Sequence, residues 1–381
     1  MANFTLRLTA QRKASVRARR ESADDWANSQ HLDAGARDKD DQGMNFRSDN
    51  TAPVAEEIMA ALTAVNHETA AAYGADAWSQ RLDNAFSDLF ETDVRVFTVA
   101  SGTAANAISL ASMTPPWGAV ICHREAHIEC DECGAPEFYA GGAKLVLADG
   151  EKAKLAPAAL REAVARNARG IHSVTPAVAS ISQATERGAV YSPEEVAALG
   201  DVCKTAGLRL HMDGARFANA VAALGCAPAD VTWKAGVEVL SFGATKNGAM
   251  AAEAVVCFDA ALAESIARLR KRGGHLFCKG RYPAAQLLAY IEDGLWLRLA
   301  AHANAMARQL GEAAAAHVSV PVESNQVFIK PGAAALEALR AAGAEFYDWG
   351  AEGSGEARLV VSWSQAREDI EAMRELLASL R

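Results

Sequence analysis

The stretch Leu208–Arg216, LRLHMDGAR, and the stretch Val237–Gly248, VEVLSFGATKNG, decide the fold of this chain. In each stretch an apolar, strand-like run leads to a polar residue. The first run ends on the carboxylate of Asp213, and the second run reaches Lys246 among small residues. Because ligands of open α/β sheets gather beyond the carboxyl ends of the strands, we expect Asp213 and Lys246 to lie at one edge of a sheet.

An acid and a lysine at two strand ends are what a pyridoxal 5'-phosphate (PLP) site needs. This cofactor requires an amine that forms a Schiff base and an anion that keeps its ring nitrogen protonated. The alternative is that Asp213 caps the next helix and Lys246 is an ordinary surface side chain. The two residues together, in this order, favour PLP. We expect Asp213 to stay ionised beside the cofactor ring, because opposite charges favour each other's charged forms.

The segment Ser101–Asn106, SGTAAN, is expected to supply the phosphate site. It lies where a strand pattern changes to a helix pattern. Gly102 permits a close backbone approach, and the free N–H groups of a first helical turn attract an anion. The alternative is a simple helix cap by Ser101 or Thr103. The rule for sheet edges places this turn on the same edge as the acid and the lysine.

From Met44 onward, strand and helix patterns alternate, which predicts βαβ units and a mainly parallel sheet flanked by helices. The predicted strands are 94–100, 118–122, 144–148, 171–181, 208–213, 237–242 and 254–258, and the predicted helices are 103–113, 160–167 and 193–207. Near residue 290 the pattern changes to Ala-rich helices around 286–315, 332–342 and 366–381, with short strands at 327–330 and 358–362.

These patterns predict two α/β domains. We expect a large domain over residues 44–290, a smaller C-terminal domain over 291–381, and residues 44–60 as a candidate bridge between them. Residues 1–43 open with an Arg-rich, acid-free run and continue with a polar, Asp-rich stretch. This composition is typical of a disordered tail or an upstream extension, with a transit peptide as the alternative.

Composition excludes several classes of protein. The 381 residues fit two domains, and 50% hydrophobic and 22% charged residues are ordinary for a globular protein. A net charge of −9 argues against a nucleic-acid partner. No apolar run approaches the ~20 residues of a membrane span, and none near the start predicts a signal peptide. Seven cysteines, an odd number in a long chain, favour reduced thiols and a cytoplasmic location.

A metal or redox module around Cys122–Cys133 is the alternative from another class of function. The segment CHREAHIECDEC holds a C-x-x-C pair with two histidines upstream. Its spacing fits no standard zinc pattern, because a second pair of ligands is missing downstream. We therefore expect no metal there, and the better interpretation makes His127 an aromatic lid over the cofactor ring.

Together, these motifs resemble the threonine aldolase family of the fold-type I PLP enzymes, over about residues 44–381. The resemblance is to the low-specificity L-threonine aldolase type. The motifs that carry it, in order, are Arg47-Ser48-Asp49, Tyr73-Gly74, Ser101-Gly102-Thr103-Ala104-Ala105-Asn106, Ala126-His127, His211-Met212-Asp213-Gly214-Ala215-Arg216, Lys246 and Arg358-Leu359-Val360.

The resemblance implies a role for each matching cofactor residue. Lys246 matches the lysine that holds PLP covalently, and Asp213 matches the partner of the ring nitrogen. Ser101, Gly102 and Thr103 match the phosphate-binding turn. His127 matches the histidine stacked on the ring, which is also a candidate for proton transfer. The resemblance places Arg216 in the cofactor site as well as in the substrate site.

The resemblance also implies that Ser48, Arg216 and Arg358 hold the carboxylate of an amino-acid substrate. The family is oligomeric with active sites at a subunit interface. We therefore expect a homodimer or homotetramer in which Tyr73 or the region 270–281 reaches a neighbour's site, with Tyr73 also a candidate for substrate contact. Lys279 and Arg281 are candidates there for a phosphate contact.

The expected reaction is the lyase cleavage of L-threonine and related β-hydroxy-α-amino acids to glycine and an aldehyde. Many relatives carry a histidine in an Asn-Thr-His-x-Gly segment, where this chain has Glu186. The base that takes the β-hydroxyl proton therefore stays open between His127, Glu186 and a water held by either. The alternative within PLP chemistry is β-elimination, racemisation or transamination, because one fold hosts many reactions.

Overall fold

The computed structural model describes residues 44–67 and 69–380, so the prediction for residues 1–43 lies outside the described part of the chain. Its centre is a seven-stranded sheet in the order β2-β8-β7-β6-β5-β3-β4. Neighbouring strands are parallel except for β8, which is antiparallel to both β2 and β7. The predicted α/β class with a mainly parallel sheet is confirmed. The strands are β2 Arg95–Val99, β3 Gly118–His123, β4 Lys144–Ala148, β5 Thr175–Ser182, β6 Arg209–Gly214, β7 Val239–Gly243 and β8 Glu253–Cys257.

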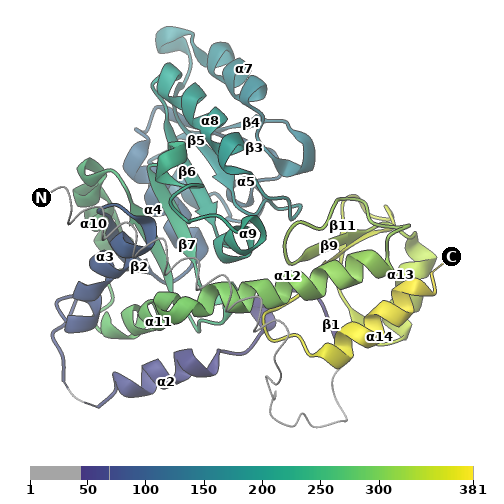
Figure 1. Ribbon diagram of the computed structural model, residues 1–381. Coiled ribbons are helices and arrows are strands. Elements are labelled where there is room, and N and C mark those ends of the chain that lie inside the picture. The colour runs from purple at the N-terminus through teal and green to yellow at the C-terminus, as the bar shows by residue number, and fades with distance from the viewer. Residues whose placement is uncertain (1–43, 68, 381) are drawn as a thin grey trace, which may run out of the picture.

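Helices cover both faces of this sheet (Figure 1). Successive residues of a strand point to opposite faces, so each strand supplies two cores. Leu240 packs on one side of the sheet and Val239 on the other, and Val256 and Val255 divide in the same way. One core includes α3 Ala77–Phe90, α7 Pro157–Asn167, α8 Pro193–Ala206 and α9 Phe217–Leu224; the other includes α4 Gly102–Met113, α5 His127–Cys130, α6 Ala135–Tyr139 and α10 Ala263–Arg272.

A second, smaller sheet has a core of its own. Its three strands are antiparallel in the order β11-β12-β9, and a short parallel pair joins β1 to β10. Phe46, just after β1, is fully buried in this core. The elements are β1 Met44–Asn45, β9 Gln326–Ile329, β10 Ala344–Glu345, β11 Tyr347–Trp349, β12 Glu356–Val360, α13 Ala333–Ala341 and α14 Arg367–Ala378.

Two helices connect the sheets. The helix expected around 286–315 is two helices, α11 Arg281–Ile291 and α12 Leu295–Ala313, because the backbone breaks at Asp293 and Gly294, which have φ of 54° and 70°. Helix α12 packs against α9, which covers the large sheet, and against α14, which belongs to the core of the small sheet (Figure 1). A further helix, α2 Glu56–Ala64, packs on α11. The domain boundary near residue 290 stays a prediction.

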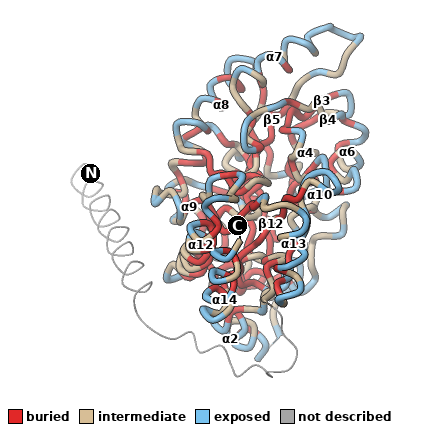
Figure 2. The backbone as a smooth tube through the Cα atoms, turned by 90° about the vertical axis from the view of Figure 1, so that its right-hand side faces the viewer, coloured by how far each residue is buried: buried red, intermediate tan, exposed pale blue. Residues whose placement is uncertain are grey.

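Two further details of the sequence prediction are wrong. The strand expected over 171–181 begins at Thr175, because Gly170–His172 forms a 3-10 turn first. The short strands β1, β10 and β11 were not expected, since two or three residues carry no periodic signal. Buried residues lie along the strands and on the inner sides of the helices (Figure 2). Among the described residues, no helix is long and apolar enough to span a membrane.

A buried histidine joins three strands of the large sheet. His211 of β6 is fully buried, with Nδ1 2.9 Å from Ser180 Oγ of β5 and Nε2 3.1 Å from Ser241 Oγ of β7. Burial lowers the pKa of His211 to about 4 from an ordinary value of 6.5. The imidazole is therefore neutral in the folded protein over the physiological range of pH.

We expect the stability of the fold to decrease as the pH falls from about 6.5 towards 4. In this range the unfolded chain binds a proton at His211 that the folded chain excludes, at about 1.4 kcal/mol per pH unit. At pH 5 the contribution of His211 is a loss of about 2 kcal/mol relative to pH 8. Urea unfolding at both pH values should show a smaller difference for His211→Asn than for the wild type. An equal difference in the two proteins would contradict the prediction.

Candidate active site

The carboxyl ends of several strands meet at one edge of the large sheet. Strands β3, β5, β6 and β7 are parallel, and β2 runs in the same direction as β7 because both are antiparallel to β8. The segments that follow these strands line one cavity of about 310 Å³, within the range of small-molecule sites. The predicted site residues that line it are Ser101, Gly102, Thr103, His127, Glu186, Asp213, Arg216 and Lys246.

Lys246 lies in a 3-10 turn, η5 Thr245–Asn247, shortly after β7. Its neighbour Asn247 donates hydrogen bonds to Tyr290 Oη at 2.7 Å and to the Trp296 carbonyl at 2.8 Å. The turn ends at Gly248, with φ of 107°, where a Cβ would lie 2.9 Å from Leu299. Glycine is therefore required to hold this turn against α12.

The electrostatic surroundings favour a neutral amine at Lys246. Burial lowers its pKa, and the nearby charge of Arg216 lowers it further, while Asp49 and Asp213 oppose the shift. A deprotonated amine is the nucleophilic form that attacks a carbonyl carbon.

Asp213 is held in a fixed orientation at the end of β6. It is buried, its Oδ1 accepts a hydrogen bond from the Ala215 N–H at 2.9 Å, and its Oδ2 accepts one from Asn106 Nδ2 at 2.8 Å. Asn106 lies on α4, so the helix after β2 orients the acid that follows β6. A carboxylate fixed in this way can pair with a protonated ring nitrogen.

The turn from β2 into α4 fits a phosphate group. Ser101 caps the helix, its Oγ accepting a hydrogen bond from the Ala104 N–H at 3.2 Å. The first N–H groups of the helix, from Gly102 and Thr103, have no partner within the helix. A Cβ added at Gly102 would meet nothing within 4 Å, so open space adjoins these donors. Open space at the N-terminus of a twelve-residue helix is a fitting place for an anion.

His127 begins the short helix after β3 and is half-buried beside the cavity. Its Nδ1 lies 2.8 Å from Oε1 of Glu132, a buried acid. This hydrogen bond raises the pKa of His127 above its ordinary value, against the opposing effect of burial. The same Oε1 accepts a hydrogen bond from Asn106 at 2.8 Å.

Glu186 lies beside His127 on the loop after β5. Its Oε1 accepts hydrogen bonds from Ser182 Oγ at 2.5 Å and from the His127 N–H at 2.9 Å. Its Oε2 is buried without a partner among the described residues. Burial raises the pKa of Glu186 to about 7, despite the hydrogen bond from Ser182. This carboxyl group can therefore exchange a proton near neutral pH.

Of the two arginines predicted to bind substrate, Arg216 lines the cavity and Arg358 does not, although the charge of Arg216 acts on Arg358. The guanidinium of Arg216 forms a two-pronged ion pair with buried Asp49, at 2.7 and 2.9 Å. Burial alone would raise the pKa of Asp49, but the charge and hydrogen bond of Arg216 bring it below its ordinary value. Arg358 stacks over Trp349 at 4.7 Å, and its Nε is buried without a partner among the described residues. Burial and the charge of Arg216 lower the pKa of Arg358 to about 10.

Several predicted residues do not line the cavity. The Oγ of Ser48 accepts a hydrogen bond from the Asn50 N–H, at the start of the 3-10 turn Asp49–Thr51. Tyr73 is 56% exposed and lies 5.0 Å from the ammonium of Lys271. Lys279 and Arg281 lie outside the cavity as well. In this chain, therefore, neither Tyr73 nor any residue of the region 270–281 lines the cavity.

Sequence reasoning assigned no role to four residues that shape the site: Asp49, Asn106, Glu132 and Glu253. Asp49 and Asn106 lay inside the quoted motifs, and a polar residue within the otherwise small and apolar α4 was an available signal. Glu132 lay in the Cys122–Cys133 segment, which was weighed as a metal or redox module because of its cysteines. Glu253 of β8 accepts a hydrogen bond from the Thr245 N–H at 3.1 Å, next to the lysine.

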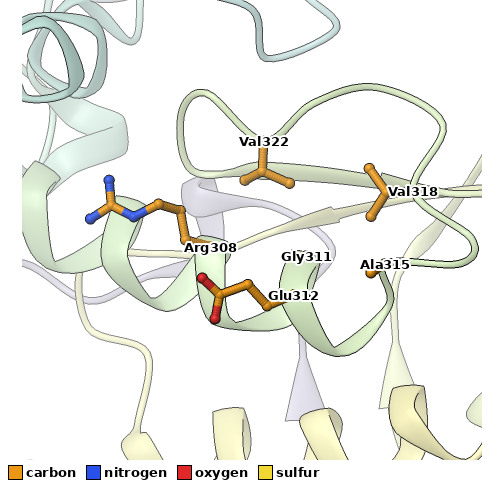
Figure 3. Close-up of a pocket in the computed structure, with 6 residues that line it drawn as sticks. All are labelled: Arg308, Gly311, Glu312, Ala315, Val318 and Val322. Carbon is orange, nitrogen blue, oxygen red and sulfur yellow. The ribbon is translucent and has the colours of Figure 1, made fainter.

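The described residues hold no metal site, and the second cavity of the structure contains no candidate catalytic group. Among the described residues, no group of three or more His, Cys, Asp or Glu side chains is arranged to hold a metal ion. A second hollow of about 370 Å³ lies between the end of α12 and the segment before β9 (Figure 3). None of its lining residues is a candidate site residue; they are Arg308, Gly311, Glu312, Ala315, Val318 and Val322.

Known proteins are similar to this chain in sequence and in fold. Residues 45–331 match the family described as beta-eliminating lyases. Low specificity L-threonine aldolase from a Pseudomonas species is 46% identical over 345 residues, covering 90% of this chain and 98% of the relative. This chain belongs to the threonine aldolases of the beta-eliminating lyase family. It is therefore an enzyme, a lyase.

Two further relatives agree with this assignment. The low specificity L-threonine aldolase of Pseudomonas aeruginosa is also 46% identical, over 90% of this chain and 98% of its own. The solved threonine aldolase of Leishmania major has a TM-score of 0.82 at 30% identity, covering 87% of this chain and 98% of its own. The expected fold, that of the fold-type I PLP enzymes, is confirmed.

Proposed function

We propose that the protein is a PLP-dependent aldolase that cleaves L-threonine and related β-hydroxy-α-amino acids to glycine and an aldehyde. The observation that carries the proposal is one cavity that is lined by Lys246, Asp213 and Glu186. The first two suit the cofactor, and the third suits removal of a proton from a hydroxyl group. The names of the 46% identical relatives support the same reaction.

The cofactor would be held by residues from four segments. Lys246 would bind its aldehyde carbon, Asp213 would pair with its ring nitrogen, and the turn Ser101–Thr103 would bind its phosphate. His127 would cover its ring. When bound, PLP supplies an electron sink that accepts the electron pair of the broken Cα–Cβ bond.

The protein's own groups bind the substrate and move its protons. Arg358 and Arg216 hold the substrate carboxylate, since a guanidinium offers two parallel donors to a carboxylate. Asp49 fixes the orientation of Arg216 through the two-pronged ion pair. Glu186, which lines the cavity, accepts the β-hydroxyl proton with its carboxylate. Loss of that proton turns the hydroxyl into the carbonyl of the aldehyde as the Cα–Cβ bond breaks, and a proton returns to Cα to give glycine.

A product assay tests the proposed function. PLP-loaded protein is incubated with L-threonine, L-allo-threonine or phenylserine, and the products are identified. We expect glycine with acetaldehyde from the first two substrates and with benzaldehyde from the third. Ammonia with a keto acid would instead indicate β-elimination, and the proposal would be wrong.

Arg358 should act on substrate binding. Replacing it with lysine removes the second, parallel donor, and a hydrogen bond to a charged group is worth about 1.5–3 kcal/mol. We expect Arg358→Lys to raise the KM for threonine about 10- to 100-fold. Acetaldehyde release coupled to alcohol dehydrogenase gives KM and kcat, and Arg374→Lys on α14 is the control. An unchanged KM would exclude Arg358 from the carboxylate site.

The assembly and location are proposals as well. We propose a homodimer or homotetramer in which Tyr73 and the region 270–281 face a neighbouring subunit's site. The exposure of Tyr73, outside the cavity of its own subunit, supports this arrangement. We propose a cytoplasmic location, supported by the odd number of cysteines, seven, in this long chain.

A further inference from the structure

A buried acid of the cavity wall has no part in the reaction described so far. Glu132 lies two residues beyond α5, and its side chain is fully buried. Its Oε1 lies 2.8 Å from both His127 Nδ1 and Asn106 Nδ2, and its Oε2 has no partner among the described residues. Among the described residues, no lysine or arginine forms an ion pair with Glu132. A buried charge without a fixed cation is costly, so His127 is the group that can compensate it.

Asn106 fixes the direction of these hydrogen bonds. Its Nδ2 donates one hydrogen to Glu132 Oε1 and the other to Asp213 Oδ2. An amide N–H group can only donate, so both carboxylate oxygens act as acceptors. An ionised Glu132 has no hydrogen to donate from Oε1, so His127 Nδ1 is the donor, which places the hydrogen of the neutral imidazole on Nδ1. The chain of contacts therefore runs from His127 through Glu132 and Asn106 to Asp213.

We propose that Glu132 and Asn106 are positioning residues that keep the proton of His127 on Nδ1 and connect this histidine to Asp213. Nε2 is then the nitrogen that gains and loses a proton beside the cavity. The role in catalysis rests on the proposed function. There, Glu132 and Asn106 set the orientation and the proton affinity of His127, which covers the cofactor ring.

The charged groups around His127 determine the expected direction. Glu132 and Asp213 favour the imidazolium form, whereas burial and Lys246 oppose it. Glu186 accepts a hydrogen bond from the backbone N–H of His127, not from its ring. Removing the charge of Glu132 should therefore lower the pKa of His127, because the hydrogen bond to this acid is the largest favourable contribution.

The test is a titration of His127 in the full-length, PLP-loaded protein. NMR of protein labelled at the histidine ring carbons follows each imidazole, and His127→Asn identifies the signal. We expect Glu132→Gln to lower the pKa of His127 by about 1 unit or more. Glu129→Gln, the same change at an exposed position on the adjacent turn, should leave it unchanged. An unchanged pKa in Glu132→Gln would overturn the proposal.

A second variant decides the matter if Glu132→Gln does not fold. Asn106→Leu keeps the size and suits a helix, but it removes the hydrogen bond that stabilises the Glu132 carboxylate. The Glu132 carboxylate then depends more on the imidazolium form of His127 for its stabilisation, so the pKa of His127 should rise. A fall, or no change, would overturn the proposal.

The titration separates this proposal from the proposed function. The NMR result does not depend on turnover, so it stands even if threonine gives no glycine. If threonine is cleaved, the pH dependence of kcat should shift in Glu132→Gln and not in Glu129→Gln. A purely structural role for Glu132 would lower the amount of active protein without shifting that profile.

Discussion

Lys246→Ala is expected to reduce threonine cleavage by about 10³-fold or more, since it removes both the covalent attachment of the cofactor and an amine beside the reacting carbon. Lys246 is the lysine of the cavity, and its turn is held by Asn247 and by the close approach at Gly248. Its lowered pKa increases the fraction of neutral, reactive amine. A lysine at another position has neither this turn nor these neighbours.

Covalent attachment gives a readout that does not depend on turnover. Sodium borohydride should fix PLP to the peptide that contains Lys246, and mass spectrometry should find the added mass in the wild type but not in Lys246→Ala. Lys144→Ala, at an exposed position on β4, is the matched control and should behave like the wild type. If Lys246→Ala cleaves threonine at the wild-type rate, the assignment of this lysine is wrong.

The sequence could predict the large sheet and the edge where the site lies. The runs at Leu208–Asp213 and Val237–Phe242 have strand patterns; the first ends at Asp213, and the second is followed by Lys246. Chain direction then brings Gly102, Asp213 and Lys246 to the same edge, without any knowledge of side-chain packing. Such predictions depend on local patterns and on the rules of parallel sheets.

The contacts that orient the site could not be predicted in this way. Asp49 meets Arg216 across 167 residues, and Asn106 meets Asp213 across 107 residues. The pairing of His127 with Glu132 joins residues only five apart, but nothing in the spacing tells that the acid faces inward. These contacts arise from the packing of helices on the sheet, and a single sequence carries no direct signal for them.

The site also illustrates a conflict between stability and reactivity. Glu132 and Glu186 each leave one carboxylate oxygen buried without a partner among the described residues. Such groups destabilise a fold, because burial removes hydration that nothing replaces. Their place at the edge of the sheet, among Lys246, His127 and Asp213, is typical of groups that serve a reaction, which is the role we propose for them.

Glu186→Gln is expected to reduce kcat for threonine about 10²- to 10⁴-fold, the usual contribution of a positioned base. Because the pKa of Glu186 is about 7, the wild-type rate should rise as the pH increases through 7, where the carboxyl group becomes ionised and able to accept the β-hydroxyl proton. Glutamine keeps the size and can still accept hydrogen bonds from Ser182 and His127, but it cannot take the proton. The rise in rate near pH 7 should therefore disappear in the variant.

The same substitution should have the opposite effect on stability. The folded protein holds a proton on Glu186 up to about pH 7, whereas the unfolded chain releases it near 4.5, so the contribution of Glu186 to stability falls as the pH rises through this range. Glu186→Gln removes that loss, and its urea midpoint at pH 8 should equal or exceed that of the wild type. Glu129→Gln, an exposed acid-to-amide change, should alter neither rate nor stability. A Glu186→Gln variant that keeps the wild-type rate and pH profile would transfer the role of base to His127 or to a bound water.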